Sequence, residues 1–404
     1  MRTRNRSTGA ATGPRPLTRR EALVRLGTTA ALCALGSGRA QAAAPEPSDR
    51  LSDLGMPLSD AERAAGEAFV RRHPSVDVHC HPGRFFLAHL PYETPTSKAF
   101  GKPFEERAFG DLTAGGVSAA LFAGVSDMRL LELTPTGIRA AREFGPGEAL
   151  ADYRRQVAEL KDLLARHPGS DGRMPADVEG AFRRRTTAIV FAIEGGDFIE
   201  DRLERVHEAF ADGVRAITIV HYHVNQIGDI QTAVPVHHGL TPLGKSIVRE
   251  MNASGIIVDL AHATFEVTRD AVAASSRPVM ISHTNLTRPG VDHPRLVSVE
   301  HARLVTEAGG IVGSVPSGIG QSTFAEYVDS IRRLIDAVGI DHVAIGTDMD
   351  ANYKPILRSY RDWSLLPAAL LARGLDEAGV AKLMGGNFLR VFGAALAGTA
   401  GARL

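Results

Sequence analysis

The sequence predicts an α/β fold in which eight βα units form a single (β/α)8 barrel of the TIM type. Short apolar runs alternate with longer amphipathic stretches, which is the pattern of parallel strands separated by helices. Eight such runs occur, and each is almost continuously apolar, as expected for strands buried on both faces. Eight units in about 330 residues are the content of one barrel domain. A doubly wound open sheet is the structural alternative.

The predicted strands follow one another at regular intervals along the chain. In order, they are Ser75–His79, Val117–Gly124, Ala188–Glu194, Ala216–His221, Ile256–Leu260, Val279–His283, Ile311–Val315 and Val343–Asp348.

Helix start and stop signals lie between these runs. Thr241-Pro242 is an N-cap followed by proline at the first helical position, and Gly255 ends that helix. Thr323–Glu326 has the pattern of a capping box, and Gly339 ends the helix that it opens. A last helix is predicted over Asp376–Phe392. These signals support the alternation of strands and helices that a barrel requires.

Residues 1–42 are predicted to be an export signal that is removed from the mature protein. They contain the pair Arg19-Arg20, a mildly apolar run over Ala22–Leu35 and the cleavage pattern Ala40-Gln41-Ala42. This arrangement is typical of twin-arginine signals, so we expect a periplasmic or secreted protein. A transmembrane anchor is not expected, because the apolar run is short and Arg25 interrupts it. The alternative is a disordered basic tail before a short amphipathic helix.

The rest of the chain divides into a linker over residues 43–53 and the barrel domain over residues 54–404. Lys plus Arg equals Asp plus Glu, at 46 each, which argues against an electrostatic binder of nucleic acid. Cys33 lies in the predicted signal, so the mature chain keeps only Cys80 and has no internal disulfide.

Side chains capable of catalysis or metal binding stand at the ends of six predicted strands. Catalytic residues of barrel enzymes occupy this carboxyl-terminal face. The residues are His79, His81, Glu194, His221, His262, His283 and Asp348.

The types and spacing of these residues point to a metal centre. His79 and His81 are two residues apart on a strand, so both rings face the same side and can reach one metal ion. Glu194 ends an apolar strand, where a carboxylate needs a metal or an ion-pair partner. His262 and His283 follow adjacent strands, and neutral imidazole is a common zinc ligand. The alternative is a structural role: the histidines would be hydrogen-bonded residues of the core, and Glu194 would belong to an ion pair.

Taken together in this order, the motifs resemble the membrane (renal-type) dipeptidase family of binuclear zinc metallopeptidases. The resemblance runs from about Ser75 to Ala395. It rests on Asp77–His79, Phe191–Gly196, Thr218–His221, Gly239–Lys245, Val258–His262, Pro278–His283, His293–Arg295, Ile345–Asp350 and Asn387–Phe392.

The resemblance implies a metal-dependent hydrolase barrel that holds two zinc ions and hydrolyses dipeptides with a metal-bridging hydroxide. One zinc would be held by His79, His81 and Glu194, and the other by Glu194, His262 and His283. His221 would contact the scissile carbonyl, Arg295 would bind the substrate's carboxylate, and Asp348 would be the general acid/base. Two features depart from the family pattern. His81 stands where the family has aspartate, and the spacing from His283 to Arg295 is about one residue longer.

Two other functions fit parts of the pattern. One is a binuclear amidohydrolase acting on cyclic amides or lactones; many such enzymes bridge their metals with a modified lysine, and none of the six lysines here ends a predicted strand. The other is a non-catalytic barrel that acts as a binding protein.

The expected partner is a small peptide, and a homodimer is implied by the family. The physiological dipeptide, tolerance of D-residues and the metal in vivo stay open, since His/Glu sites accept other divalent ions.

Overall fold

Eight parallel strands form the centre of the protein in the computed structural model, which describes residues 52–91 and 93–399. The sheet order is β1-β2-β5-β6-β7-β8-β9-β10. The strands are β1 Val76–Cys80, β2 Ala119–Val125, β5 Ala188–Glu194, β6 Val214–Thr218, β7 Ile257–Asp259, β8 Met280–Thr284, β9 Ile311–Ser314 and β10 Val343–Ile345. All eight predicted strands are confirmed; β5 has the predicted bounds, and the ends of the others differ by at most three residues.

The two edges of this sheet meet, which closes it into a barrel. Just beyond β10, the Asp348 N–H donates to the His79 carbonyl over 2.8 Å, and the His81 N–H donates to the Met349 carbonyl over 3.0 Å. Cys80 and Met349 form a parallel bridge. The predicted barrel is therefore confirmed, and an open doubly wound sheet is excluded.

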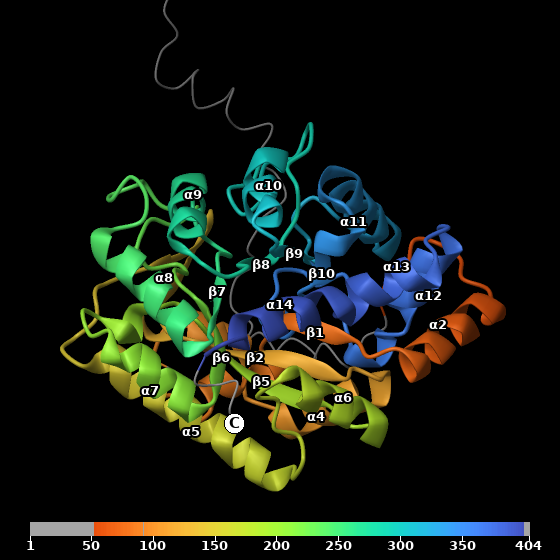
Figure 1. Ribbon diagram of the computed structural model, residues 1–404, viewed down its shortest axis with the longest axis horizontal. Helices are drawn as coiled ribbons and strands as arrows, with labels where there is room; N and C mark the ends of the chain where they lie inside the picture. Colours follow the sequence, from red (N-terminus) through yellow and green to blue (C-terminus); the bar gives the residue numbers. More distant parts are fainter. Residues whose placement is uncertain (1–51, 92, 400–404) are drawn as a thin grey trace, which may run out of the picture. The chain divides into compact units, whose positions relative to one another are not determined.

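Helices surround the strands (Figure 1). They are α2 Asp60–Arg72, α3 Pro95–Phe100, α4 Glu105–Gly115, α5 Glu148–Arg166, α6 Pro175–Arg184, α7 Glu204–Asp212, α8 Pro242–Ser254, α9 Phe265–Ala274, α10 Val299–Glu307, α11 Phe324–Val338, α12 Leu365–Ala372, α13 Glu377–Ala381 and α14 Asn387–Leu396. The predicted caps are present: the Thr241 side chain accepts from the Gly244 N–H, and Thr323 and Glu326 form a capping box.

The predicted last helix is present and contains a π-helical turn. Asp376 caps α13, and the turn over Lys382–Gly386 joins α13 to α14 without leaving helical backbone geometry. A Cβ atom on Gly385 would lie 2.7 Å from the Pro74 carbonyl oxygen, so glycine permits close contact with the segment that enters β1. Phe388 and Phe392 of α14 pack against residues near the amino ends of the strands, and α14 lies across the strands in the view of Figure 1.

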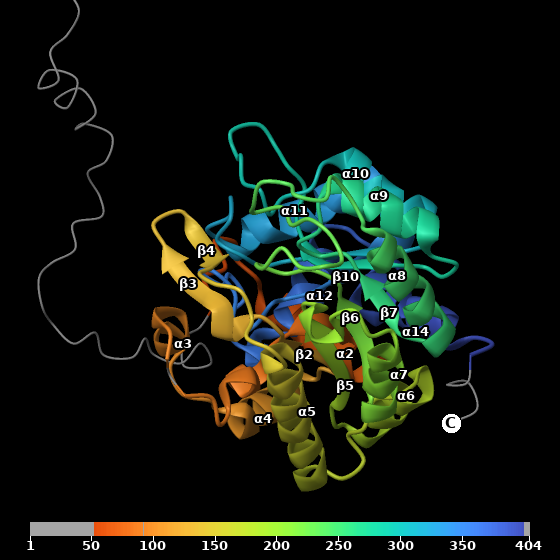
Figure 2. The ribbon, with the colours of Figure 1, turned by 90° about the vertical axis from the view of Figure 1, so that its left-hand side faces the viewer.

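A β-hairpin follows β2 and was not predicted. Its strands are β3, Leu131–Thr134, and β4, Gly137–Ala140, paired in antiparallel register. The hairpin extends to one side of the barrel near α3 (Figure 2). It leaves Leu133 half exposed.

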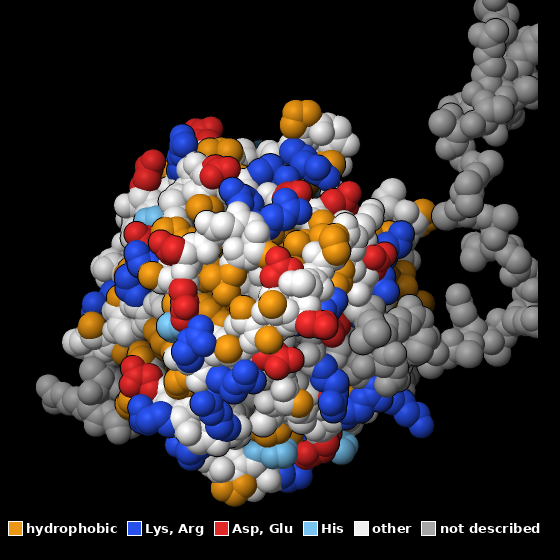
Figure 3. Space-filling view, turned by 90° about the vertical axis from the view of Figure 1, so that its right-hand side faces the viewer, with side chains coloured by type: hydrophobic (Ala, Val, Ile, Leu, Met, Phe, Trp, Pro, Cys, Tyr) orange, Lys and Arg blue, Asp and Glu red, His pale blue; other side chains and the backbone are white. Residues whose placement is uncertain are grey.

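The surface mixes charges of both signs with apolar side chains on the face near α2 and α12, as Figure 3 shows. Within residues 52–91 and 93–399, no helix combines the length and the apolar character needed to cross a membrane.

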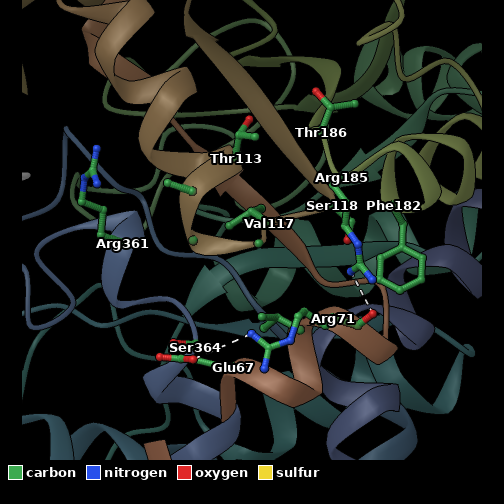
Figure 4. Close-up of a pocket in the computed structure, with 14 residues that line it drawn as sticks. Glu67, Arg71, Thr113, Val117, Ser118, Phe182, Arg185, Thr186, Arg361 and Ser364 are labelled. Carbon is green, nitrogen blue, oxygen red and sulfur yellow. Dashed lines mark hydrogen bonds and ion pairs between the residues drawn. The ribbon is translucent and has the colours of Figure 1, made fainter. Parts of the chain in front are cut away.

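A cavity of about 380 Å³ lies at the amino ends of β2 and β5 (Figure 4). Three arginines line it, but each already has a partner in the chain. Arg361 Nε lies 2.6 Å from Asp111, Arg185 donates to the Arg71 carbonyl over 2.8 Å, and Arg71 lies 3.7 Å from Glu67. The candidate metal ligands occupy the opposite ends of the strands.

Candidate metal centre

Two groups of buried His and Glu side chains adjoin each other at the carboxyl ends of the strands. One contains His79, His81 and Glu194, and the other contains Glu194, His262 and His283. In each group the potential ligand atoms all lie within 4.8 Å of one another. The structure therefore brings all five predicted metal ligands together, with Glu194 common to both groups.

Glu194 reaches both groups with its carboxylate. Its Oε2 atom lies 3.4 Å from His81 Nε2, and its Oε1 atom lies 3.5 Å from His79 Nε2. The Oε1 atom also lies 2.9 Å from His262 Nε2 and 3.5 Å from His283 Nε2. A carboxylate in this position can contact two metal ions at once.

The distances between the histidine nitrogens are those expected of two ligands on one divalent metal ion. His79 Nε2 and His81 Nε2 lie 3.2 Å apart, as do His262 Nε2 and His283 Nε2. Two nitrogens on one tetrahedral zinc ion, each about 2.0–2.1 Å from it, are separated by roughly 3.3 Å. Glu194 Oε1 is buried and makes no hydrogen bond to any described residue. Buried polar atoms of this kind usually have a partner.

The electrostatics suit metal ligation. Burial alone would raise the pKa of Glu194, but the surrounding side chains of His221, His79 and His262 outweigh burial and hold the pKa well below its usual value. Burial, with Arg295 nearby, keeps the pKa of His262 well below the usual range. The carboxylate is thus anionic and the His262 imidazole is neutral, the forms that bind metal.

His81 stands where the family pattern has aspartate, and its ring is firmly oriented. Its Nδ1–H donates to the Ala123 carbonyl over 2.7 Å, which directs Nε2 towards Glu194 and Asp348. Burial opposes the charged ring, but hydrogen bonds to Asp348 and Glu194 outweigh it and raise the pKa of His81 to about 10. A metal ion would have to displace this proton.

The three remaining predicted site residues also lie at this centre. His221 Nε2 is 3.3 Å from Glu194 Oε2, and Asp348 Oδ1 is 3.2 Å from His81 Nε2. The Arg295 guanidinium lies 3.1 Å from His283 Nε2 and also bonds Gln231. The Asp348 side chain is 23% exposed, whereas those of Glu194 and His81 are 3% and 1% exposed. Of these groups, Asp348 is therefore the one most open to water and substrate.

Local backbone geometry supports the arrangement. His262 and Asp348 have positive φ angles of 68° and 53°, a conformation that costs energy for residues other than glycine and is common at functional sites. Gly195 follows Glu194 at φ 98°, and a Cβ atom there would lie 2.9 Å from the Ser126 side chain. Glycine thus allows the close approach expected after this strand.

The sequence analysis missed Asp127, which holds His221. The Asp127 carboxylate accepts from His221 Nδ1–H over 2.6 Å and from the backbone N–H of Tyr222 and His223 over 3.0 and 2.9 Å. Burial opposes a charged His221, but Asp127 and Glu194 outweigh it and raise its pKa. Asp127 comes two residues after β2, so a search just beyond the strand ends could have made it a candidate, although its partner His221 is evident only in the folded chain.

His223 lies two residues after His221, but its side chain has different partners. His223 faces away from both metal groups: its Nδ1 lies 2.7 Å from Asp197 Oδ1 and its Nε2 lies 2.8 Å from Glu143 Oε2. Burial lowers the pKa of His223, but these carboxylates outweigh it and raise the pKa to about 9. His223 therefore forms ion pairs with Asp197 and Glu143, and His221 is the histidine of the two that belongs to the site.

A closed (β/α)8 barrel with two adjoining His/Glu groups at the carboxyl ends of its strands is the arrangement of a metal-dependent hydrolase. The sequence model of the membrane dipeptidase family (peptidase family M19) matches residues 66–401. The chain belongs to that family, which confirms the resemblance.

Similar proteins include two curated fungal dipeptidases. Dipeptidase verJ of Clonostachys rogersoniana is 29% identical over 253 residues, which are 60% of this chain and 65% of the relative. Dipeptidase tcpJ of Claviceps purpurea is 33% identical over 226 residues, 53% of this chain and 52% of the relative. The chain thus matches between half and two thirds of the length of each relative.

A solved structure of similar fold is a metallo peptidase from Rhodobacter sphaeroides, liganded with a phosphinate mimic of L-Ala-D-Ala. It has a TM-score of 0.67 and 20% identity, and the match covers 80% of this chain and 99% of that one. At this identity the likeness supports the fold.

Proposed function

We propose that this protein is a binuclear metallodipeptidase that hydrolyses dipeptides with a free carboxylate. The observation that carries the proposal is the sharing of Glu194 between two buried ligand groups, with Arg295 and Asp348 beside them. Membership of the membrane dipeptidase family supports the same activity. The shared residue is a glutamate rather than a lysine, which disfavours an amidohydrolase bridged by modified lysine.

Two zinc ions are the proposed cofactor, one in each group, although the donor set also accepts other divalent ions. Metal ions here would supply Lewis acidity and make water nucleophilic at neutral pH. Substrate binding and proton transfer would be carried out by side chains of the protein.

Three residues would bind the substrate and move protons. Arg295 presents a planar guanidinium that matches a carboxylate in two parallel hydrogen bonds. His221 donates Nδ1–H to Asp127, and Asp127 and Glu194 raise its pKa, which favours a second proton on Nε2. A protonated Nε2 would donate to the scissile carbonyl oxygen. Asp348 would take a proton from the attacking water and deliver it to the leaving amine.

The role of Arg295 predicts a preference for free dipeptides over their C-terminal amides. A hydrogen bond between charged groups contributes about 1.5–3 kcal/mol, so Arg295→Ala should lower kcat/KM for a dipeptide by roughly 10- to 100-fold. The amide should be a poor substrate for wild type and should be little affected by the substitution. Steady-state kinetics on Ala- and Leu-containing dipeptides and their amides would measure both effects.

Arg288→Ala is a matched control, because Arg288 lies in the same loop but bonds the Gly320 carbonyl. It should leave the preference unchanged. Equal cleavage of dipeptide and amide by wild type would reject the carboxylate anchor and favour hydrolysis of cyclic amides or lactones.

We also propose twin-arginine export, supported by Arg19-Arg20 and by Ala40-Gln41-Ala42. These residues lie outside the described part of the chain. Replacing Arg19 and Arg20 by lysine should retain the precursor in the cytoplasm, and N-terminal sequencing of the exported wild type should begin near Ala43. Undiminished export of the double variant would reject this route.

A further inference from the structure

We infer that Ser282 is a positioning residue whose single hydroxyl orients one histidine in each of the two metal-binding groups. The inference rests on the proposed metal centre and extends it to a residue outside both ligand sets. Ser282 lies in β8, directly before His283, and its exposed fraction is 0%. Its hydroxyl is therefore confined to partners inside the protein.

The contacts of the Ser282 hydroxyl define its role. The oxygen lies 3.0 Å from His283 Nδ1 and 3.4 Å from His79 Nδ1, while the hydroxyl itself donates to Asp259 Oδ2 over 2.6 Å. A hydroxyl has one proton to donate and two lone pairs. Because the Asp259 carboxylate takes the proton, both lone pairs can accept Nδ1–H groups from the two rings.

This pattern selects one tautomer of each histidine. A neutral imidazole has one N–H, so donation from Nδ1 leaves the lone pair on Nε2. In His79 that nitrogen faces His81 and Glu194, and in His283 it faces His262 and Glu194. The tautomer that Ser282 stabilises is the one each metal-binding group requires.

The arrangement also joins the two groups mechanically. His79 comes from β1 and His283 from β8, and their ring centroids lie 4.1 Å apart with planes inclined by 31°. Asp259 is fixed in turn, because it accepts from the Ser282 N–H over 2.8 Å and from the Thr218 hydroxyl over 2.5 Å. One side chain therefore sets the angle of a ring in each group.

Removing the hydroxyl should weaken both metals together. In Ser282→Ala, two buried Nδ1–H groups lose their acceptor, and the rings are free to adopt the other tautomer. Loss of an outer hydrogen-bond partner of a ligand typically costs about 10–100-fold in metal affinity. We expect a loss of this size for both Zn²⁺ ions, measured by titrating chelator-treated protein with Zn²⁺ against a competing indicator.

Thr218→Val is the matched control. The Thr218 hydroxyl bonds the same Asp259 oxygen, and among the described residues it makes no hydrogen bond to an imidazole. Both variants should lower the unfolding temperature of chelator-treated protein, but only Ser282→Ala should reduce Zn²⁺ affinity. Ser282→Cys keeps a side chain of similar size with a weak acceptor, so it should lose less Zn²⁺ affinity than Ser282→Ala. It replaces the alanine variant in the test if that variant does not fold.

The outcomes separate this inference from the function on which it rests. A wild type that binds two Zn²⁺, together with a folded Ser282→Ala that binds both equally well or loses only one, would overturn the role of Ser282. The same result follows if Thr218→Val matches the alanine variant in Zn²⁺ affinity. A wild type that binds no Zn²⁺ would instead reject the proposed metal centre.

Discussion

Replacing Asp348 by asparagine is expected to lower kcat for dipeptide hydrolysis by about 10²–10⁴-fold, the usual contribution of a general acid or base. The amide keeps the size of the side chain but cannot take a proton from water. Asp348 Oδ1 lies 3.2 Å from His81 Nε2 and its side chain is 23% exposed, so it borders the centre while remaining open to substrate. In the proposed role the carboxylate acts on the reacting atoms, so kcat should fall far more than KM changes.

The measurement combines kinetics with metal analysis. Asp348 belongs to neither ligand group, so Asp348→Asn should retain both metal ions. Asp350→Asn is a suitable control, because Asp350 lies two residues away and accepts from the Gly83 N–H, a bond that an asparagine oxygen can replace. That variant should stay near the wild-type rate. A fully loaded Asp348→Asn enzyme within tenfold of wild type would remove Asp348 from the acid/base role.

The strands were predictable because a parallel barrel buries both faces of each strand. In Ala188–Glu194 all seven residues are buried, so the strand is almost continuously apolar and stands out in the sequence. The helix caps were predictable because they depend on hydrogen bonds between near neighbours, as at Thr323 and Glu326. The β3–β4 hairpin was missed because its two short strands are mostly partly buried or exposed and lack a continuous apolar run.

The positions of the site residues were predictable for a topological reason. In a parallel barrel the carboxyl ends of all strands meet at one face, so residues far apart in the chain become neighbours. Glu194 and His283 could therefore be assigned to one centre before any distance was known. The π-helical turn between α13 and α14 could not be foreseen, because it lies where Gly385 packs closely against Pro74, a contact across the fold that the local sequence does not indicate.

Residues that orient the site were harder to find. Asp127 and His221 are 94 positions apart, and Ser282 and His79 are 203 positions apart. Aspartate and serine are common near strand ends, so neither type signals a partnership with a particular histidine. Their roles come from hydrogen-bond geometry, which only the folded chain supplies.

Glu194→Gln is expected to abolish tight binding of both metal ions and to reduce dipeptidase activity to background. Glutamine keeps the shape but removes the negative charge that the two groups share. Each group would lose an anionic ligand, so each affinity should fall by more than the roughly 10–100-fold cost of losing an outer hydrogen-bond partner. Elemental analysis after desalting, together with Zn²⁺ titration against a competing indicator, would measure the loss.

The comparison with His262→Gln makes the prediction specific to a shared ligand. His262 belongs to one group only, so its replacement should weaken one ion and leave the His79–His81 group occupied. The expected stoichiometries are two metal ions for wild type, one for His262→Gln and none for Glu194→Gln. Thermal unfolding of chelator-treated samples controls for loss of the fold. If folded Glu194→Gln retains one tightly bound ion, Glu194 does not bridge the two groups, and the binuclear mechanism built on it is wrong.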